Sequence, residues 1–297
     1  KQNREAKFFC VGDDWQSIFR FAGSDLGLFR NFESHFGYTK LAKIETTYRF
    51  NEPMIGVSGG FVMKNPNQIR KKLKAPEGTE EVTHTVVEAM GEDETEAVSR
   101  IFAGMAKADA SPSHEVMLIG RYNSDFDRIK NTQGRLTVNA DSKKVTYEIA
   151  QGKHRGKKYV ANFVTAHRAK GLQADVVIVL NCNAGSFPSE RADDPLLTLL
   201  LSRADAFEHG EERRLFYVAM TRAKKKTYFV TNTNRKSSFI KEMESKGHSS
   251  PRRRACPQCT TGEIVERPVS TNDSPFFGCT NYPYCKYTTK RPARTLA

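Results

Sequence analysis

The chain has 297 residues and a mass of 33.5 kDa, enough for one large domain or two smaller ones with a hydrophobic core. Its 47 lysine and arginine residues outnumber 34 acidic residues. The net charge of +13 favours a polyanionic partner, either nucleic acid or an acidic membrane surface. No run reaches the roughly 18 apolar residues of a membrane span, so no membrane-spanning helix is expected.

Apolar runs of strand length alternate with amphipathic runs of helix length. Strands are expected at residues 8–12, 82–90, 115–120, 159–165, 174–181 and 226–231. Helices are expected at residues 54–64, 92–107, 125–130 and 211–223, with a hairpin around 145–147. Nearly continuous apolar strands that alternate with helices are typical of a parallel sheet in an α/β fold.

The excess of positive charge is concentrated towards the end of the chain. Residues 235–297 contain 12 basic and 5 acidic residues, a surplus of seven. Residues 245–255 are polar and basic and contain Ser, Gly and Pro, which is typical of a linker. Because the chain begins at Lys1, without a methionine or a signal peptide, we expect it to be a piece of a longer protein.

Two of the six cysteines, Cys10 and Cys182, lie in apolar runs and are predicted to be small buried hydrophobic residues. The other four form two close pairs: Cys256, Cys259, Cys279 and Cys285. Thiolates at this spacing can hold a tetrahedral zinc ion, and free thiols or disulfides are the alternatives. Four thiolates leave no open position, so Zn²⁺ would be structural.

Polar and aromatic residues follow the first predicted strand, at residues 8–12. Open α/β sheets place ligands at the carboxyl ends of strands, where Gln16 could orient a water or touch a terminal phosphate. Phe19 and Phe21 lie two residues apart, so an extended segment would put both rings on one face. Beside Arg20 they would suit stacking against unpaired bases. As isolated phenylalanines, both would instead be core residues.

Four runs resemble, in order, motifs III to VI of the UvrD/Rep superfamily 1 DNA helicases. They are VGDDWQSIFRFAGSD at 11–25, TYRF at 47–50, TAHRAKGLQAD at 165–175 and EERRLFYVAMTRA at 211–223. MLIGRYN at 117–123 and GSFP at 185–188 also resemble segments of that family. Because the order of the motifs matches as well, the resemblance covers roughly residues 5–231. The short distance of about 115 residues between motifs IV and V resembles the helicase IV branch.

The resemblance implies a RecA-like fold that binds ATP with Mg²⁺ between two lobes. The residues implied to act at the γ-phosphate are Gln16, Arg49 and Arg222. The residues implied to bind the nucleotide are Tyr48, Lys170, Gly171 and Gln173. The residues implied to contact single-stranded DNA are Phe19, Phe21, Thr165 and His167. Two positions depart from the family pattern, because Ala22 replaces an arginine and Gln173 replaces a glutamate that contacts the ribose.

The C-terminal run CPQC…GCTNYPYCKYT resembles the C4 zinc finger at the tail of bacterial type IA topoisomerases, where it binds single-stranded DNA. Aromatic and basic side chains alternate in this run, which suits base stacking combined with phosphate contacts. Some of the rings must form the core of so small a module. We expect Tyr284 and Tyr287 to be exposed and to contact DNA.

The predicted organisation is a remnant of a first RecA-like domain at 1–40, a second RecA-like domain at 41–244, the linker, and a zinc finger at 256–290. No GxxxxGK[ST] phosphate-binding loop occurs, so the chain alone is expected to be inactive. In the longer protein, the resemblance implies ATP-dependent 3′-to-5′ unwinding of DNA, on single strands or single-/double-strand junctions and with no membrane partner. It also implies a cytoplasmic, nucleoid-associated bacterial protein.

Two alternatives remain open. A decayed helicase half could act as a non-enzymatic nucleic-acid-binding protein through its zinc module. The chain could also be an obligate subunit that completes the ATP site of a partner chain, which would then supply the phosphate-binding loop in trans.

Overall fold

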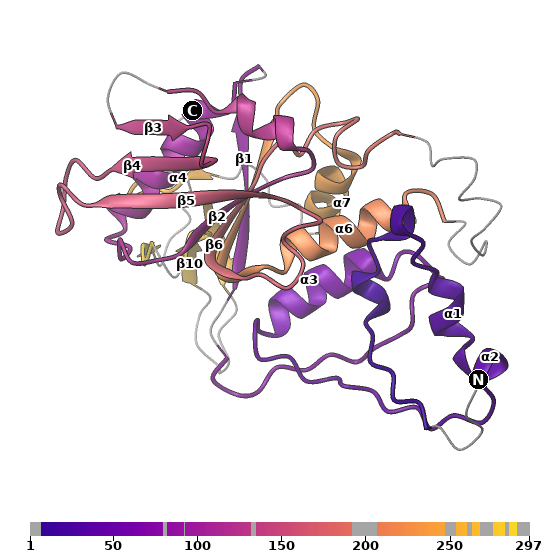
Figure 1. Cartoon of the computed structure of the whole chain (residues 1–297). Helices are drawn as coiled ribbons and strands as arrows, with labels where there is room; N and C mark the ends of the chain where they lie inside the picture. Colours follow the sequence, from indigo (N-terminus) through magenta and orange to yellow (C-terminus); the bar gives the residue numbers. More distant parts are fainter. Residues whose placement is uncertain are drawn as a thin grey trace.

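The computed structural model describes residues 7–79, 82–91, 93–131, 135–191, 207–246, 254–259, 263–267, 276–282 and 285–289. A seven-stranded sheet lies between layers of helices, and a four-stranded sheet forms the C-terminal module (Figure 1). The strands of the large sheet are β1 (Thr83–Ala89), β2 (Val116–Gly120), β3 (Leu136–Asn139), β4 (Lys144–Glu148), β5 (Lys158–Thr165), β6 (Ala174–Val179) and β7 (Ala223–Asn232). They lie in the order β1-β7-β6-β2-β5-β4-β3.

The helices of the described chain include four α-helices that cover the large sheet: α3 (Glu52–Val62), α4 (Thr95–Lys107), α6 (Gly210–Met220) and α7 (Ser238–Lys246). The N-terminal segment holds two short α-helices and two 3₁₀ turns: α1 (Leu26–Arg30), α2 (Phe32–Phe36), η1 (Asp14–Gln16) and η2 (Arg20–Ala22). The helix predicted at 125–130 is a 3₁₀ helix, η3 (Asn123–Arg128).

Five neighbouring strands, β1, β7, β6, β2 and β5, run parallel, as predicted. Strands β3 and β4 pair with each other antiparallel, and β4 also pairs antiparallel with β5. The turn between β3 and β4 is too short for a parallel crossover, so this hairpin adds an antiparallel edge. The predicted α/β fold with flanking helices is therefore confirmed, with a sheet that is mixed rather than purely parallel.

Alternate residues of the central strands point to opposite faces of the sheet. Val176 and Ile178 of β6 belong to the hydrophobic cluster beneath α4. Val177 and Val179 belong to the cluster that packs against α3, α6 and α7. Side chains alternate between the faces of a strand, so a strand covered on both sides must be apolar at every position. Figure 1 shows α4 on one face and the other three helices on the opposite face.

The strand predicted at residues 8–12 does not form in the described chain. Phe8 is 61% exposed, Phe9 94% and Val11 76%, and this segment pairs with no strand in the part of the chain described. An extended segment becomes a strand only when a neighbouring strand satisfies its N–H and C=O groups. Cys10 is correspondingly exposed, which corrects the prediction that it is buried, whereas Cys182 is buried as predicted.

The boundary between α6 and β7 differs from the prediction and sets the position of Arg222. The helix predicted at 211–223 ends at Met220, and β7 begins at Ala223, three residues earlier than predicted. Arg222 therefore lies at the junction between α6 and β7.

The C-terminal module is an antiparallel sheet of β8 (Arg254–Ala255), β9 (Glu263–Arg267), β10 (Phe276–Cys279) and β11 (Thr288–Thr289). Its strands lie in the order β11-β10-β9-β8. Residues 247–253 of the predicted linker lie outside the described residues. Within the described chain, no helix combines the length and apolar character needed to cross a membrane.

Candidate functional site

Four of the residues predicted around the nucleotide line one cavity of about 390 Å³: Gln16, Tyr48, Arg49 and Gln173. They come from η1, from the loop before α3 and from the loop before β6. Tyr48 is 82% exposed, so its ring is available to a ligand. Lys170 and Gly171 do not line this cavity. The Lys170 ammonium instead lies 5.1 Å from the centre of the Phe19 ring.

Arg222 does not line this cavity and is 1% exposed, but it lies close to Arg49 and Tyr217, which do line it. Its Nε donates to the Val218 carbonyl oxygen at 2.9 Å, and its Nη2 to Thr221 Oγ1 at 3.0 Å. Burial, together with the positive charge of nearby Arg49, lowers the pKa of Arg222 to about 10. The Nε of Arg49 is buried and has no hydrogen-bond partner within the described chain. Two guanidinium groups that repel each other beside a cavity are suited to an anion, which would neutralise both.

Gln16, which lines this cavity, is held in place by Asp13. The Asp13 carboxylate accepts a hydrogen bond from Gln16 Nε2 and forms an ion pair with Lys71. The neighbouring Trp15 packs edge-to-face against Tyr217 of α6, with ring centres 5.6 Å apart. Motif III is thereby fixed to the helix that carries motif VI.

The aromatic residues predicted to contact DNA meet in one cluster. The Phe21 ring lies 5.3 Å from the His167 ring and 5.9 Å from the Phe19 ring. Phe21 is 62% exposed, whereas Phe19 is partly buried against the hydrophobic core. Phe19 therefore behaves as a core residue, whereas the exposed ring of Phe21 is free to stack on a base. Thr165 lies at the same edge of the sheet, at the end of β5.

His167 is uncharged at neutral pH. Burial and the positive charge of Arg121 lower its pKa to about 4, although a hydrogen bond to the Ile18 backbone opposes this shift. A neutral imidazole can stack or form hydrogen bonds, but it does not attract phosphate as a cation would. Stacking is thus the contact with nucleic acid that this residue is suited to make.

The two glutamates that begin α6 do more than complement the helix dipole. Glu211 accepts a hydrogen bond from the Arg20 backbone N–H at 2.9 Å. Glu212 forms a bidentate ion pair with Arg121, with a closest distance of 2.7 Å, and accepts from the Ser189 backbone N–H at 3.0 Å. Arg121 was missed as a site residue, although it lies in the GRYN run. Its role depends on a contact with a residue far along the chain.

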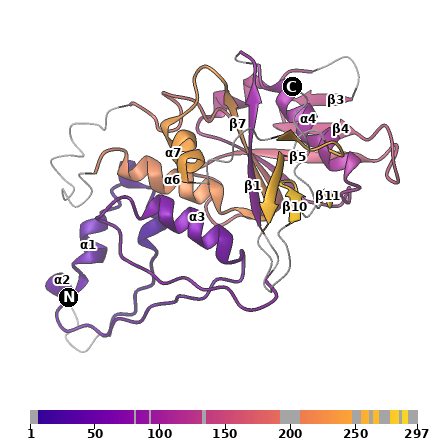
Figure 2. The same ribbon diagram turned by 180° about the vertical axis from the view of Figure 1, so that it is seen from behind.

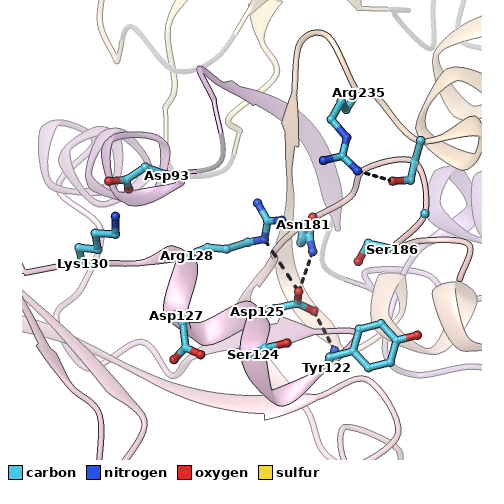
Figure 3. Close-up of a pocket in the computed structure, with 12 residues that line it drawn as sticks. Asp93, Tyr122, Ser124, Asp125, Asp127, Arg128, Lys130, Asn181, Ser186 and Arg235 are labelled. Atoms are coloured by element: carbon cyan, nitrogen blue, oxygen red, sulfur yellow. Dashed lines mark hydrogen bonds and ion pairs between the residues drawn. The ribbon is translucent and has the colours of Figure 1, made fainter.

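A larger cavity of about 590 Å³ lies at the carboxyl ends of β2 and β6. None of the residues that line it was predicted to be a site residue. Figure 3 shows Asp125, Asn181 and Arg128 meeting at its centre. Asn181 Nδ2 donates to Asp125 Oδ1 at 2.6 Å, and the Asn181 backbone N–H donates to Glu94 at 3.0 Å. Asn181 has a φ of 52°, which Asn tolerates better than most residues. Sequence patterns do not reveal this network, because Glu94, Asp125 and Asn181 come from separate parts of the chain.

Glu94, which accepts a hydrogen bond from the Asn181 backbone in this network, should make the stability of the fold depend on pH. Burial raises its pKa from 4.5 to about 8, so the folded protein holds the proton more tightly than the unfolded chain. This contribution to stability is fully present below pH 4.5 and is lost as the pH rises through about 8. We expect Glu94→Gln, which stays neutral, to flatten that dependence and raise the unfolding temperature at pH 8. Thermal unfolding followed by circular dichroism between pH 4 and pH 9 measures both.

Glu96→Gln is the matched control for this experiment, because Glu96 lies on the exposed face of the same helix. Its pH dependence should equal that of the parent chain. An unchanged slope in Glu94→Gln would show that Glu94 does not titrate in this range.

The four predicted zinc ligands converge in the C-terminal module. Their Sγ atoms all lie within 4.8 Å of one another, and all four side chains are buried. The Sγ atoms of Cys256 and Cys285 are 3.6 Å apart, as are those of Cys259 and Cys279. This separation is too long for a disulfide, in which the two sulfur atoms are about 2.05 Å apart. It is close to what four sulfurs at about 2.3 Å from a tetrahedral zinc ion require. The residues therefore fit a structural zinc ion.

The aromatic residues of this module do not all match the prediction. Tyr287 is partly buried and packs against the cysteine cluster, which corrects its predicted exposure. Tyr284 lies outside the described residues. Tyr282 is 41% exposed and is the better candidate for stacking. A ring that follows a metal ligand closely can pack over the site, which the spacing alone does not reveal.

Known proteins match both parts of the chain. Residues 143–234 match the UvrD-like helicase C-terminal domain, and residues 253–294 match the topoisomerase DNA binding C4 zinc finger. DNA helicase IV of Escherichia coli (strain K12) is 30% identical over 247 residues, which are 82% of this chain and 32% of that protein. The ATP-dependent DNA helicase PcrA of Bacillus subtilis (strain 168) is 36% identical over 98 residues, 30% of this chain and 12% of that protein.

Among solved structures, the C-terminal domain of a possible DNA helicase from Lactobacillus plantarum WCFS1 is similar, with a TM-score of 0.36 and 16% identity. The match covers 65% of this chain and 92% of that chain. The chain spans about a third or less of the length of the curated relatives that it matches. The two family models and DNA helicase IV confirm the predicted resemblance to UvrD/Rep helicases, to their helicase IV branch and to the topoisomerase-type zinc finger.

Proposed function

We propose that this chain, which carries a UvrD-like helicase C-terminal domain and a topoisomerase-type zinc finger, is the second ATP- and DNA-binding half of a helicase. The observation that carries the proposal is that Gln16 and Arg49 line one cavity, and that Arg222 lies close enough to Arg49 for their charges to interact. The helicase would move 3′ to 5′ on single-stranded DNA. A DNA substrate would place the protein with the nucleoid in the bacterial cytoplasm.

ATP with Mg²⁺ would lie between this cavity and a phosphate-binding loop, which the preceding sequence or a partner chain would supply. Arg49 and Arg222 would contact the γ-phosphate, where their charges stabilise the negative charge that develops during phosphoryl transfer. Tyr48 would pack its exposed ring against the adenine. Gln173 would donate or accept a hydrogen bond at the ribose, without the charge of a glutamate.

Gln16 and the aromatic cluster would couple hydrolysis to movement on DNA. Gln16 lines the nucleotide cavity, and Phe19, three residues later, belongs to the cluster. A change at the γ-phosphate could therefore shift the rings through a very short segment of chain. The exposed ring of Phe21 would stack on a base, and neutral His167 would support it from the edge.

ATP hydrolysis with and without single-stranded DNA tests the proposal, on this chain and on a form extended upstream to its natural start. We expect DNA-stimulated turnover in the extended form only. No turnover in either form, with DNA binding retained, would indicate a non-enzymatic zinc-dependent DNA-binding protein. Turnover that appears only after adding a partner with a phosphate-binding loop would indicate an obligate subunit.

Replacing Phe21 with alanine should weaken binding of single-stranded DNA by about tenfold, because stacking of one base contributes roughly 1–3 kcal/mol. Fluorescence anisotropy with a labelled oligonucleotide measures this loss. Phe36→Ala is the matched control, since Phe36 is another exposed phenylalanine (43% exposed) of the N-terminal segment, outside the cluster. Equal affinities for the two variants would remove Phe21 from the DNA path.

A further inference from the structure

We infer that the zinc module is docked as a fixed part of the large domain, and that Asn281 links its metal site directly to strand β1. The inference goes beyond the proposed helicase function, because it concerns how metal binding orders the domain. Figure 2 shows β10 beside β1, which is one of the two edge strands of the seven-stranded sheet. Hydrogen bonds from three residues of the large domain carry the inference.

Asn281 contacts the cysteines and the large domain at once. It is 2% exposed. Its backbone N–H donates to Cys279 Sγ and its Nδ2 to Cys259 Sγ, each at 3.3 Å. Its Oδ1 accepts a hydrogen bond from Thr85 Oγ1 of β1 at 3.4 Å. Residues that donate to metal ligands orient them and stabilise the charge of bound thiolates. The position of Asn281, and with it the geometry of two zinc ligands, therefore depends on β1.

A buried lysine forms the second link. Lys226 of β7 is 0% exposed, and its Nζ donates to Thr83 Oγ1 at 3.0 Å and to the carbonyl oxygen of Thr280 in the zinc module. Thr83 Oγ1 in turn donates to the Tyr282 carbonyl oxygen at 2.7 Å. A buried ammonium is costly unless acceptors surround it. The zinc module supplies one of these acceptors, so the docked arrangement lowers the cost of burying Lys226.

The two links join the zinc module to the large domain along β1 and the start of β7. Thr83 and Lys226 lie opposite each other at the amino ends of β1 and β7. Strand β7 begins directly after Arg222. The loop that holds Thr280 and Asn281 directly follows the ligand Cys279. Without the metal, the thiols no longer fix this loop, and the amino ends of β1 and β7 lose their cover.

The first test is the zinc affinity of the full chain, measured by competition with a coloured chelator. Thr85→Val keeps the shape of the side chain and its preference for a strand, and removes only the hydroxyl. We expect it to weaken zinc binding about tenfold, as loss of a partner behind a metal ligand does. Thr137→Val on exposed β3 is the matched control and should leave the affinity unchanged.

The second test separates a role at the metal from a purely structural one. With Co²⁺ in place of Zn²⁺, Asn281→Ala should shift the sulfur-to-cobalt charge-transfer absorption, because it removes the hydrogen bond from Nδ2 to Cys259 Sγ. Thr137→Val should leave the spectrum unchanged. Hydrogen exchange of the zinc-loaded and the chelator-treated chain should differ at the amino ends of β1 and β7, and not at β5.

Lys226→Met provides a third variant whose zinc ligands are intact. We expect the amide exchange of β10 and of the start of β1 to accelerate in this variant even with zinc bound. The inference is overturned if Thr85→Val binds zinc as tightly as Thr137→Val and chelation leaves the exchange of β1 unchanged. None of these readouts requires ATP or DNA, so failure here is distinguishable from failure of the proposed helicase function.

Discussion

Replacing Arg222 with alanine in a form of the protein that has its phosphate-binding loop should lower DNA-stimulated ATP hydrolysis by about 10³-fold or more. The guanidinium of Arg222 lies close to Arg49, which lines the cavity together with Gln16 and Tyr48. In the proposed role, Arg222 would act mainly on the transition state, where charge develops on the γ-phosphate. Turnover should therefore fall far more than nucleotide affinity. Steady-state kinetics with a nucleotide-binding assay separates the two quantities.

Two further variants distinguish loss of function from loss of fold. Arg222 is almost fully buried, so its removal also breaks hydrogen bonds to Val218 and Thr221. Arg222→Lys keeps the positive charge but not the planar fork, and should be almost as inactive while unfolding at nearly the same temperature. Arg155→Ala, at an exposed turn before β5, should retain full turnover. Turnover of a folded Arg222→Ala within threefold of the parent would rule out this role.

Replacing Cys279 with serine should remove zinc and unfold the C-terminal module while the large domain stays folded. The zinc site contributes most of the stability of so small a module, since structural zinc typically binds with about 10–16 kcal/mol in isolated fingers. The described module has only a small core around the four cysteines, whereas the rest of the described chain has two large hydrophobic clusters. Metal analysis and limited proteolysis measure the two parts of this prediction.

The control for this variant is Cys10→Ser, because Cys10 is an exposed cysteine outside the module. It should retain one zinc ion per chain and the protease resistance of the parent. The affinity for single-stranded DNA should also fall in Cys279→Ser, together with its dependence on salt, since the basic residues of the module would no longer be held in one surface. A Cys279→Ser protein that retains a full zinc ion would contradict the assignment of this ligand.

Local patterns in the sequence were enough for most strands of the large sheet and for the grouping of the four cysteines. Strands β2 and β6 are apolar at every position because helices cover both faces of the sheet, and that pattern is visible without a structure. The four cysteines could be picked out because two close pairs of thiolates are a common source of ligands for a structural zinc ion, and their Sγ atoms do converge. The order of the helicase motifs likewise identified Gln16, Arg49 and Arg222 as candidates, and their catalytic role stays a prediction.

Only the tertiary structure decided which residues meet. Phe21 and His167 come from distant parts of the chain, and no local pattern shows that their rings lie 5.3 Å apart. The same holds for Glu94 with Asn181 and for Thr85 with Asn281, whose hydrogen bonds join segments far apart in the sequence. The apolar segment at residues 8–12 failed as a strand because a strand is completed by its neighbour, and the described chain contains none for it. Periodicity reports which face of an element is buried, whereas contacts across the fold depend on how the elements pack in three dimensions.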